Sequence, residues 1–161
     1  MTKRLATLAV NALIEEATLT PKPALVDRQS NGAHRDLDLA RMLRSAAALH
    51  PAFAAMGHAA AGQAPSQRLR EKLGRIGREG EAAMLTATGG SNAHRGAIWI
   101  VGLLVAGAAM SGPFATAHAI ADAAAHVARF RDRFTPDLAS NGARACARYG
   151  VTGARGEARG G

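Results

Sequence analysis

The sequence predicts an all-α protein, a multi-helical single domain of about six helices. Apolar residues recur at helical spacing along most of the chain, and proline or glycine stands at each predicted boundary. The composition agrees, because 48% of the 161 residues are hydrophobic while only 4% are aromatic. Such a core consists mainly of small aliphatic side chains, which favour close packing between helices.

The first third of the chain should form two long helices joined by a stiff loop. The first helix must end at Thr20-Pro21-Lys22-Pro23, because proline lacks an N–H and forces the residue before it to be extended. A rigid loop then continues to His34. Pro51 begins a further short helix that runs through Met56. We expect the two longer helices over residues 2–19 and 36–49.

The remaining helices are expected over residues 66–88, 94–110, 114–133 and 136–149. Ser66 is a good N-cap for the first of these. Gly74, Gly77 and Gly80 weaken that helix, which suggests that a neighbouring helix or a ligand approaches it closely. The helix over 94–110 is almost entirely apolar and should be central. Its apolar stretch is shorter than the roughly 18 residues that span a bilayer, so a membrane protein is not expected.

The charge predicts anionic partners. The net charge is +8, and arginines supply most of it. These arginines are scattered through apolar helices without an aromatic platform, which favours nucleotide phosphates over nucleic acid. Cys146 is the only cysteine, so a reducing compartment is expected, and polar residues interrupt the N-terminal apolar run before a signal peptide is complete. We therefore expect a cytoplasmic protein.

An anion site is suggested where a polar loop runs into the helix over 94–110. Gly89 and Gly90 allow the backbone to approach a ligand, and Asn92, His94 and Arg95 add donors at the positive end of the helix dipole. A plain turn with an N-cap is the alternative. The pattern is echoed by Ser30-Asn31-Gly32-Ala33-His34-Arg35 and, incompletely, by Ser140-Asn141-Gly142-Ala143-Arg144, which suggests several phosphate-binding segments or a chance similarity.

Carboxylates accompany these cations. Asp36 lies beside His34 and could act in chemistry or only stabilise a helix N-terminus. Glu81 shares a core-facing stripe with Met84 and Leu85, and a carboxylate on such a stripe needs a partner. That partner could be an arginine or lysine, a metal ion or a substrate.

Four ordered motifs resemble the signatures of triphosphoribosyl-dephospho-coenzyme A synthases. They lie at residues 16–27, 32–36, 81–98 and 153–158, and include Thr20-Pro21-Lys22-Pro23, Gly32-Ala33-His34-Arg35-Asp36, Thr88-Gly89-Gly90-Ser91-Asn92-Ala93-His94-Arg95-Gly96 and Gly153-Ala154-Arg155-Gly156-Glu157-Ala158. The resemblance implies an all-helical enzyme that transfers the triphosphoribosyl group of ATP to 3′-dephospho-coenzyme A and releases adenine. The product would be the prosthetic-group precursor of citrate lyase or malonate decarboxylase.

The implied chemistry assigns roles to residues of the motifs. Asp36 and Glu81 are the candidates for acid/base catalysis, and together with Glu16 for binding Mg²⁺, which accompanies the triphosphate. Glu157 stands behind them. The substrate-binding set comprises Lys22, Asp27, His34, Arg35, Gly89, Gly90, Asn92, His94, Arg95 and Arg155.

The sequence departs from the family pattern at three positions and near its end. Ala24 stands where the family usually has glycine, and Ser91 and Ala93 stand where valine and threonine are usual. We expect a helical nucleotide-binding domain over 1–149 and a Gly/Arg-rich tail over 150–161 that carries the start of a further motif, as in an incomplete version of a larger helical fold. A non-catalytic protein that binds a nucleotide or a partner, and a basic module that binds nucleic acid, are the alternatives.

Overall fold

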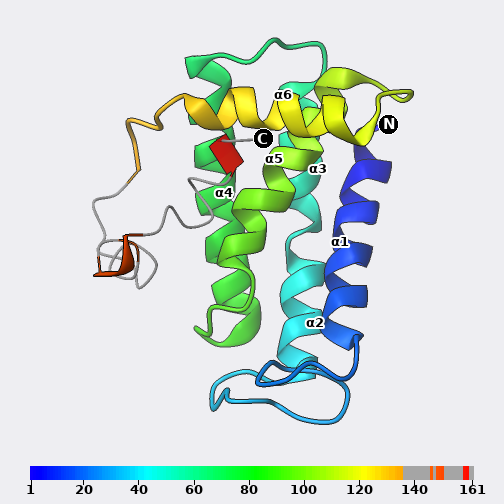
Figure 1. The fold of residues 1–161 in the computed structure, drawn as a ribbon, viewed down its shortest axis with the longest axis vertical. Helices are drawn as coiled ribbons and strands as arrows, with labels where there is room; N and C mark the ends of the chain where they lie inside the picture. Colours follow the sequence, from blue (N-terminus) through cyan, green and yellow to red (C-terminus); the bar gives the residue numbers. More distant parts are fainter. Residues whose placement is uncertain (136–145, 147, 151–157, 160–161) are drawn as a thin grey trace.

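The computed structural model describes residues 1–135, 146, 148–150 and 158–159. Over residues 1–135 the chain forms six helices and no strand, as the sequence predicts (Figure 1). They are α1 (Thr2–Thr18), α2 (Leu39–Ala48), α3 (His50–Ala60), α4 (Gln67–Thr88), α5 (Arg95–Ser111) and α6 (Ala117–Arg129).

Two predicted helix starts were wrong, and N-capping explains both. The start of α2 falls at Leu39 rather than residue 36, because the Asp38 carboxylate accepts a hydrogen bond from Arg41 N at 2.7 Å. Asp36 therefore stays in the loop. Thr116 caps α6 in the same way through Ala119 N, so this helix begins at 117 instead of 114, and it ends at 129 instead of 133. The short helix expected from Pro51 to Met56 is longer and covers His50–Ala60.

The predicted helix over 136–149 and the tail over 150–161 lie outside the described residues, except for 146, 148–150 and 158–159. The incomplete third copy of the repeated pattern, Ser140–Arg144, also lies outside the described residues. Cys146 is half-buried and its thiol is free.

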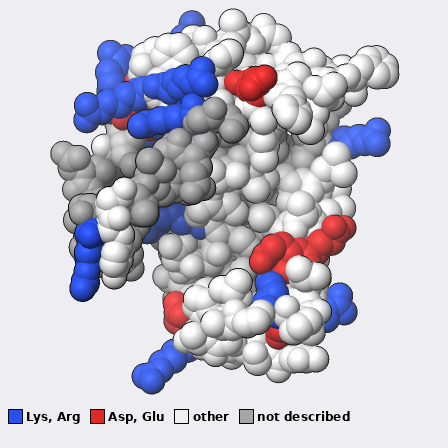
Figure 2. Space-filling view, viewed as in Figure 1, with Lys and Arg blue, Asp and Glu red and all other residues white. Residues whose placement is uncertain are grey.

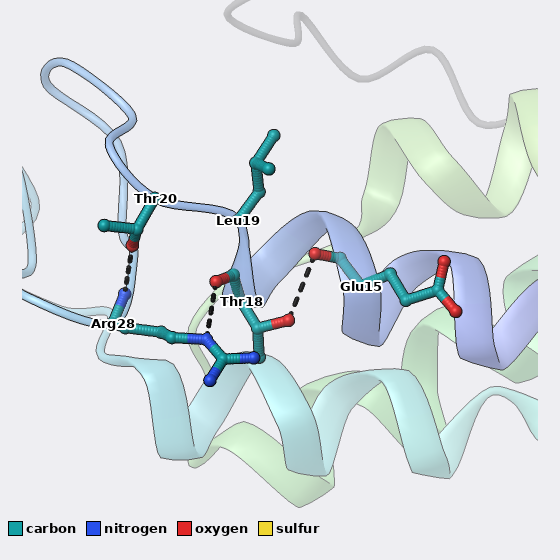
Figure 3. A pocket seen from close by; sticks show the side chains of 5 residues that line it. All are labelled: Glu15, Thr18, Leu19, Thr20 and Arg28. Atoms are coloured by element: carbon teal, nitrogen blue, oxygen red, sulfur yellow. Dashed lines mark hydrogen bonds between the residues drawn. The ribbon is translucent and has the colours of Figure 1, made fainter.

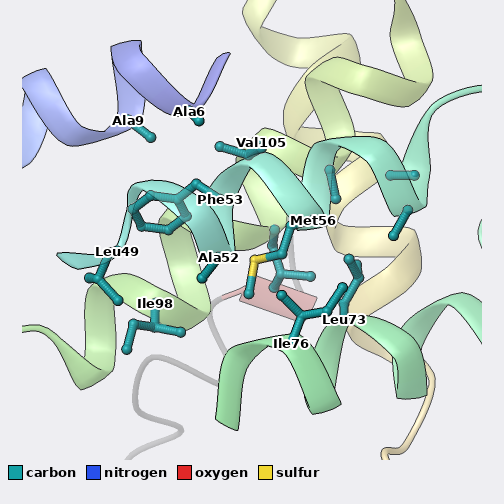
Figure 4. Close-up of a cluster of buried hydrophobic side chains, with 14 of the residues drawn as sticks. Ala6, Ala9, Leu49, Ala52, Phe53, Met56, Leu73, Ile76, Ile98 and Val105 are labelled. Carbon is teal, nitrogen blue, oxygen red and sulfur yellow. The ribbon is translucent and has the colours of Figure 1, made fainter. Parts of the chain in front are cut away.

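The core surrounds α3, which packs against α1, α4 and α5. Figure 4 shows Phe53 of α3 on the side of Ala9 of α1 and Ile98 of α5, and Met56 beside Leu73 and Ile76 of α4. The glycines of α4 allow the close approach that the sequence suggested. A Cβ at Gly80 would lie only 2.8 Å from Ala52 Cβ, and one at Gly77 would lie 3.5 Å from Met56 Cε. No helix of the described residues is long and apolar enough to cross a membrane.

An ion-pair cluster joins α4 to the segment that follows α6. The Asp132 carboxylate, only 2% exposed, lies 2.7 Å from Arg78 Nη1 and 3.6 Å from Arg70 Nη1. Gly74 makes room for it, because a Cβ there would lie 2.1 Å from Asp132 Oδ2. Figure 1 shows α6 crossing this end of the bundle, whereas the long loop 19–38 and the α4–α5 turn lie together at the opposite end. We call that opposite end the loop end.

Candidate functional site

The first segment of the loop end is organised around Asp27, which is 6% exposed. Its carboxylate accepts hydrogen bonds from Lys22 N at 3.1 Å, Gln29 N at 2.7 Å and Ser30 N at 2.9 Å. These backbone donors, that of Lys22 foremost, hold the pKa of Asp27 below its usual value. In this structure Asp27 therefore orders the loop from within, and its carboxylate faces the loop backbone.

A second contact closes the same loop. Ala33 N donates to Ala24 O at 3.0 Å, and both Ala24 and Gly32 have left-handed backbone conformations, with φ of +64° and +57°. The backbone of residues 24–25 packs directly on Gly32, so closely that a Cβ there would lie 2.4 Å from Ala24 C. The loop is thus a fixed structure that can hold side chains in place.

This loop meets the α4–α5 turn. Ser91 Oγ donates to Asp36 O at 2.9 Å, although the two residues are 55 apart in sequence. Behind them, Arg44 of α2 donates through Nε to Ala87 O of α4 at 3.3 Å. The two segments that carry the repeated motifs therefore converge in space, as one shared site requires.

His94 lies inside the protein at this junction. Its ring is buried, with Nδ1 2.7 Å from Ser45 Oγ, and its backbone N–H points at Met84 Sδ 3.2 Å away. Nε2 has no hydrogen-bond partner among the described residues. Burial lowers the pKa of His94, while the nearby Glu16 carboxylate raises it and the Lys22 ammonium lowers it to smaller extents. Burial thus favours the neutral form of the ring, which faces inward, in contrast to the expected donor at the surface of a helix N-terminus.

Two of the expected cations, Lys22 and Arg95, are paired with expected carboxylates. Lys22 Nζ donates to Glu16 Oε1 at 2.9 Å and to Glu16 O at 2.7 Å. Arg95 Nε donates to Glu81 Oε1 at 2.5 Å. Of the partners considered for Glu81, an arginine is the one it has in this structure.

His34 and Asp36 remain at the surface. His34 Nδ1 lies 3.9 Å from Asp36 Oδ1, and the side chain of Asp36 is 65% exposed. Arg35 is exposed beside them.

The glycine turn is open to solvent. Gly89 and Gly90 are exposed, with φ of +67° and +95°, and a Cβ at either would meet nothing within 4 Å. Asn92 Oδ1 accepts a hydrogen bond from Arg95 N at 3.1 Å, so Asn92 caps the first turn of α5. The remaining expected site residues, Arg155 and Glu157, lie outside the described part of the chain.

One arginine of the loop was not among the expected site residues. Arg28 lines an open pocket of about 380 Å³ at the end of α1, together with Glu15, Thr18, Leu19 and Thr20 (Figure 3). Its Nε donates to Thr18 O at 2.8 Å, and its backbone N–H donates to Thr20 Oγ1 at 3.1 Å. Arg28 lies outside the echoed motifs, so the only signal for it was its position in a stiff loop.

The carboxylates do not form a metal cage. Among the described residues, no three His, Cys, Asp or Glu side chains are grouped as metal ligands would be. Glu16, Glu81 and Asp38 are held by Lys or Arg, which leaves Asp36 as the exposed, described carboxylate at the junction without such a partner. Because Mg²⁺ commonly uses one or two carboxylates together with substrate phosphates, this arrangement fits an ion that arrives with a nucleotide.

The chain is similar to proteins of one family along its whole length. A family model described as ATP:dephospho-CoA triphosphoribosyl transferase matches residues 2–161. A Pseudomonas fluorescens (strain Pf-5) protein named "Probable 2-(5''-triphosphoribosyl)-3'-dephosphocoenzyme-A synthase" is 56% identical over 161 residues, which cover 99% of this chain and 55% of the relative. The Klebsiella pneumoniae protein named 2-(5''-triphosphoribosyl)-3'-dephosphocoenzyme-A synthase is 54% identical over 155 residues, covering 96% of this chain and 55% of that relative.

This chain thus spans about half the length of the curated relatives it matches. No solved structure matches it. The sequence motifs, the helical fold and the match over residues 2–161 agree, and the chain belongs to the ATP:dephospho-CoA triphosphoribosyl transferase family.

Proposed function

We propose that this chain transfers the 5-triphosphoribosyl group of ATP to the 2′-hydroxyl of 3′-dephospho-coenzyme A and releases adenine. The product would serve malonate decarboxylase or citrate lyase as the precursor of their prosthetic group. Membership of the family supports the reaction. The observation that carries the choice of site is the contact between Ser91 Oγ and Asp36 O, which joins the two motif segments at the loop end.

The proposed reaction is a substitution at the anomeric carbon of the ATP ribose. The 2′-hydroxyl oxygen bonds to this carbon, the bond from the carbon to adenine breaks, and adenine takes up a proton as it leaves. The hydroxyl proton passes to a carboxylate, which also stabilises the positive charge that develops on the ribose ring.

We assign the proton-accepting role to Asp36. Its side chain is exposed and, among the described residues, its carboxylate is paired with the His34 ring at 3.9 Å, while its backbone carbonyl accepts from Ser91 and Arg41. Glu81 and Glu16 would then act as positioning residues, since each holds one cation, Arg95 or Lys22. These cations and the open turn at Gly89 would face the triphosphate.

The Mg²⁺ ion would neutralise phosphate charge during the transfer, and Asp36 is the residue that could share its coordination. We place the reaction in the cytoplasm, in keeping with the single free cysteine. A nucleic-acid-binding role has less support. Figure 2 shows the densest group of Lys and Arg side chains near the end opposite the loop, whereas both signs of charge are mixed at the loop end.

Adenine release tests the proposal. The purified chain is incubated with Mg·ATP, with and without dephospho-coenzyme A, and adenine is measured by chromatography. We expect release that depends on dephospho-coenzyme A and falls by about a hundredfold or more in Asp36→Asn, as for loss of a general base. Asp122→Asn, which removes an exposed carboxylate from α6, is the matched control and should behave as wild type.

Two other outcomes would contradict the proposal. ATP binding without any adenine release would indicate a non-catalytic nucleotide-binding protein. Binding of DNA or RNA with steep salt dependence and no preference for ATP would indicate a nucleic-acid-binding module.

A further inference from the structure

Two of the cations that the sequence motifs place at the loop end, Lys22 and Arg95, are already neutralised, whereas Arg35 is exposed. Lys22 is paired with Glu16, and Arg95 is paired with Glu81, in both cases through direct contacts between charged groups. An incoming anion must compete with these carboxylates, because a paired cation attracts a further negative charge less strongly. Positive groups that hold no carboxylate are therefore the stronger attraction for a polyphosphate, which carries several negative charges.

Arg28 is such a group. Its Nε is held by Thr18 O at 2.8 Å and its own backbone N–H by Thr20 Oγ1 at 3.1 Å, so the side chain is anchored beside the last turn of α1. Within residues 1–135, no carboxylate forms an ion pair with it. Among the described residues only Nε of its guanidinium is engaged, so the terminal Nη groups keep their N–H donors, in the fork geometry that matches phosphate oxygens.

The pocket around Arg28 has room for a phosphate chain, and Glu15 is its acidic lining residue. Arg28 lines the pocket of about 380 Å³ at the end of α1, which lies within the size range of ligand sites. Thr20 Oγ1 accepts the hydrogen bond from Arg28 N, and the Thr20 side chain is also hydrogen-bonded to the Asp27 carboxylate, so Thr20 fixes the loop beside the pocket. Figure 3 shows the guanidinium beside Thr18, with Leu19 directed away from it.

We propose that Arg28 binds a polyphosphate group in this pocket, as a substrate-binding residue that the family motifs do not identify. The proposal rests on the proposed function only for the choice of ligands, since two substrates carry such a group, the triphosphate of ATP and the diphosphate of dephospho-coenzyme A. The competing explanation is that Arg28 only caps the C-terminal end of α1, where a cation is favourable. If Arg28 only caps α1, its replacement should change the stability of the fold, whereas if Arg28 binds phosphate, its replacement should change the affinity for polyphosphate.

Calorimetric titration with inorganic tripolyphosphate separates the two explanations. Arg28→Gln should weaken binding about tenfold or more, the range for loss of charged hydrogen bonds. Arg28→Lys keeps the charge but loses the fork, so it should fall between wild type and Arg28→Gln. Arg68→Gln is the matched control, because it removes the same charge from an exposed position in the first turn of α4. That position is about 30 Å along the helix from its loop end, and the variant should bind as wild type.

Thermal unfolding of each variant shows whether the fold is retained. Titrations with ATP and with dephospho-coenzyme A then identify the substrate, since only the one whose phosphates reach Arg28 should lose affinity in Arg28→Gln. Equal binding of tripolyphosphate by wild type and Arg28→Gln would overturn the inference, and so would a lack of binding by wild type. Retained polyphosphate binding without adenine release would contradict the proposed function and leave the role of Arg28 intact.

Discussion

Replacement of Gly32 by alanine tests whether the loop over residues 19–38 must keep its closed form. The new Cβ would lie 2.4 Å from Ala24 C and Ala24 O and 2.6 Å from Leu25 N. These are backbone atoms, so they cannot rotate away as the end of a flexible side chain could. The two sides of the loop must separate, and the hydrogen bond from Ala33 N to Ala24 O must lengthen or break.

The size of the effect follows from two contributions. Alanine at a φ of +57° costs about 1 kcal/mol. Loss of the hydrogen bond from Ala33 to Ala24 adds about 1 kcal/mol. The closed loop should therefore be destabilised by about 2 kcal/mol, which corresponds to roughly a thirtyfold increase in the open population.

Gly62→Ala is the matched control. Gly62 has a similar φ of +68°, yet a Cβ there would meet nothing within 4 Å. This variant should show only the conformational cost, about 1 kcal/mol, in the connector between α3 and α4. The difference between the two variants isolates the contact with Ala24 and Leu25.

Hydrogen exchange measured by NMR is the assay. The amides of Leu25, Asp27 and Ala33 donate within the loop, to Lys22 O, Ser30 O and Ala24 O, so their exchange reports its opening. They should exchange about thirty times faster in Gly32→Ala, and tripolyphosphate affinity should fall with them. Unchanged exchange at all three amides would show that the loop accommodates the new Cβ without opening, contrary to this prediction, and faster exchange with full tripolyphosphate affinity would show that the closed loop is not needed for binding.

Three further predictions concern stability. Ala24→Gly should raise the free energy of opening the same loop by up to about 1 kcal/mol, because glycine adopts the φ of +64° without strain. The loop amides should then exchange more slowly, and faster exchange would contradict this. His94 has a folded pKa below its unfolded value of about 6.5, so its contribution to stability is complete above that pH and is lost as the pH falls below it. Urea midpoints of wild type should therefore fall more steeply below pH 6.5 than those of His94→Asn, and parallel curves would count against the buried ring. Gly74→Ala should lower the unfolding free energy by about 2 kcal/mol or more by displacing the buried Asp132 carboxylate. Gly96→Ala, with open space around the new Cβ, should not cause such a loss. Equal urea midpoints for the two variants would argue against the close contact between Gly74 and Asp132.

The helices could be predicted well because their signals are local. Ser66 was recognisable as an N-cap, and its Oγ accepts a hydrogen bond from Leu69 N at 3.2 Å. The errors at residues 36 and 114 have a local cause too. In each case a residue slightly later in the chain, Asp38 or Thr116, accepts the capping hydrogen bond, and several polar residues near one another are equally good candidates from sequence alone.

The site could be predicted only in outline. The repeated motifs indicated that the loop and the α4–α5 turn meet, and they do. Spacing could not show that Glu81 holds Arg95 or that His94 turns inward to Ser45, because these partners are 14 and 49 residues apart. Such pairings depend on tertiary packing, and a motif records only which residues are present.

Ala24 shows what the sequence and the structure give together. The family resemblance indicated a usual glycine at this position, without a reason. The structure supplies the reason, since the backbone there has a φ of +64°, a conformation that glycine adopts readily.

NMR mapping of Mg·ATP on the isotope-labelled chain shows whether the loop end is the nucleotide site. Chemical-shift changes should gather in residues 20–36 and 87–96, and they should fade together in Arg28→Gln. Changes gathered instead around Arg78 and Asp132, near the opposite end of the bundle, with the loop end unaffected, would contradict it.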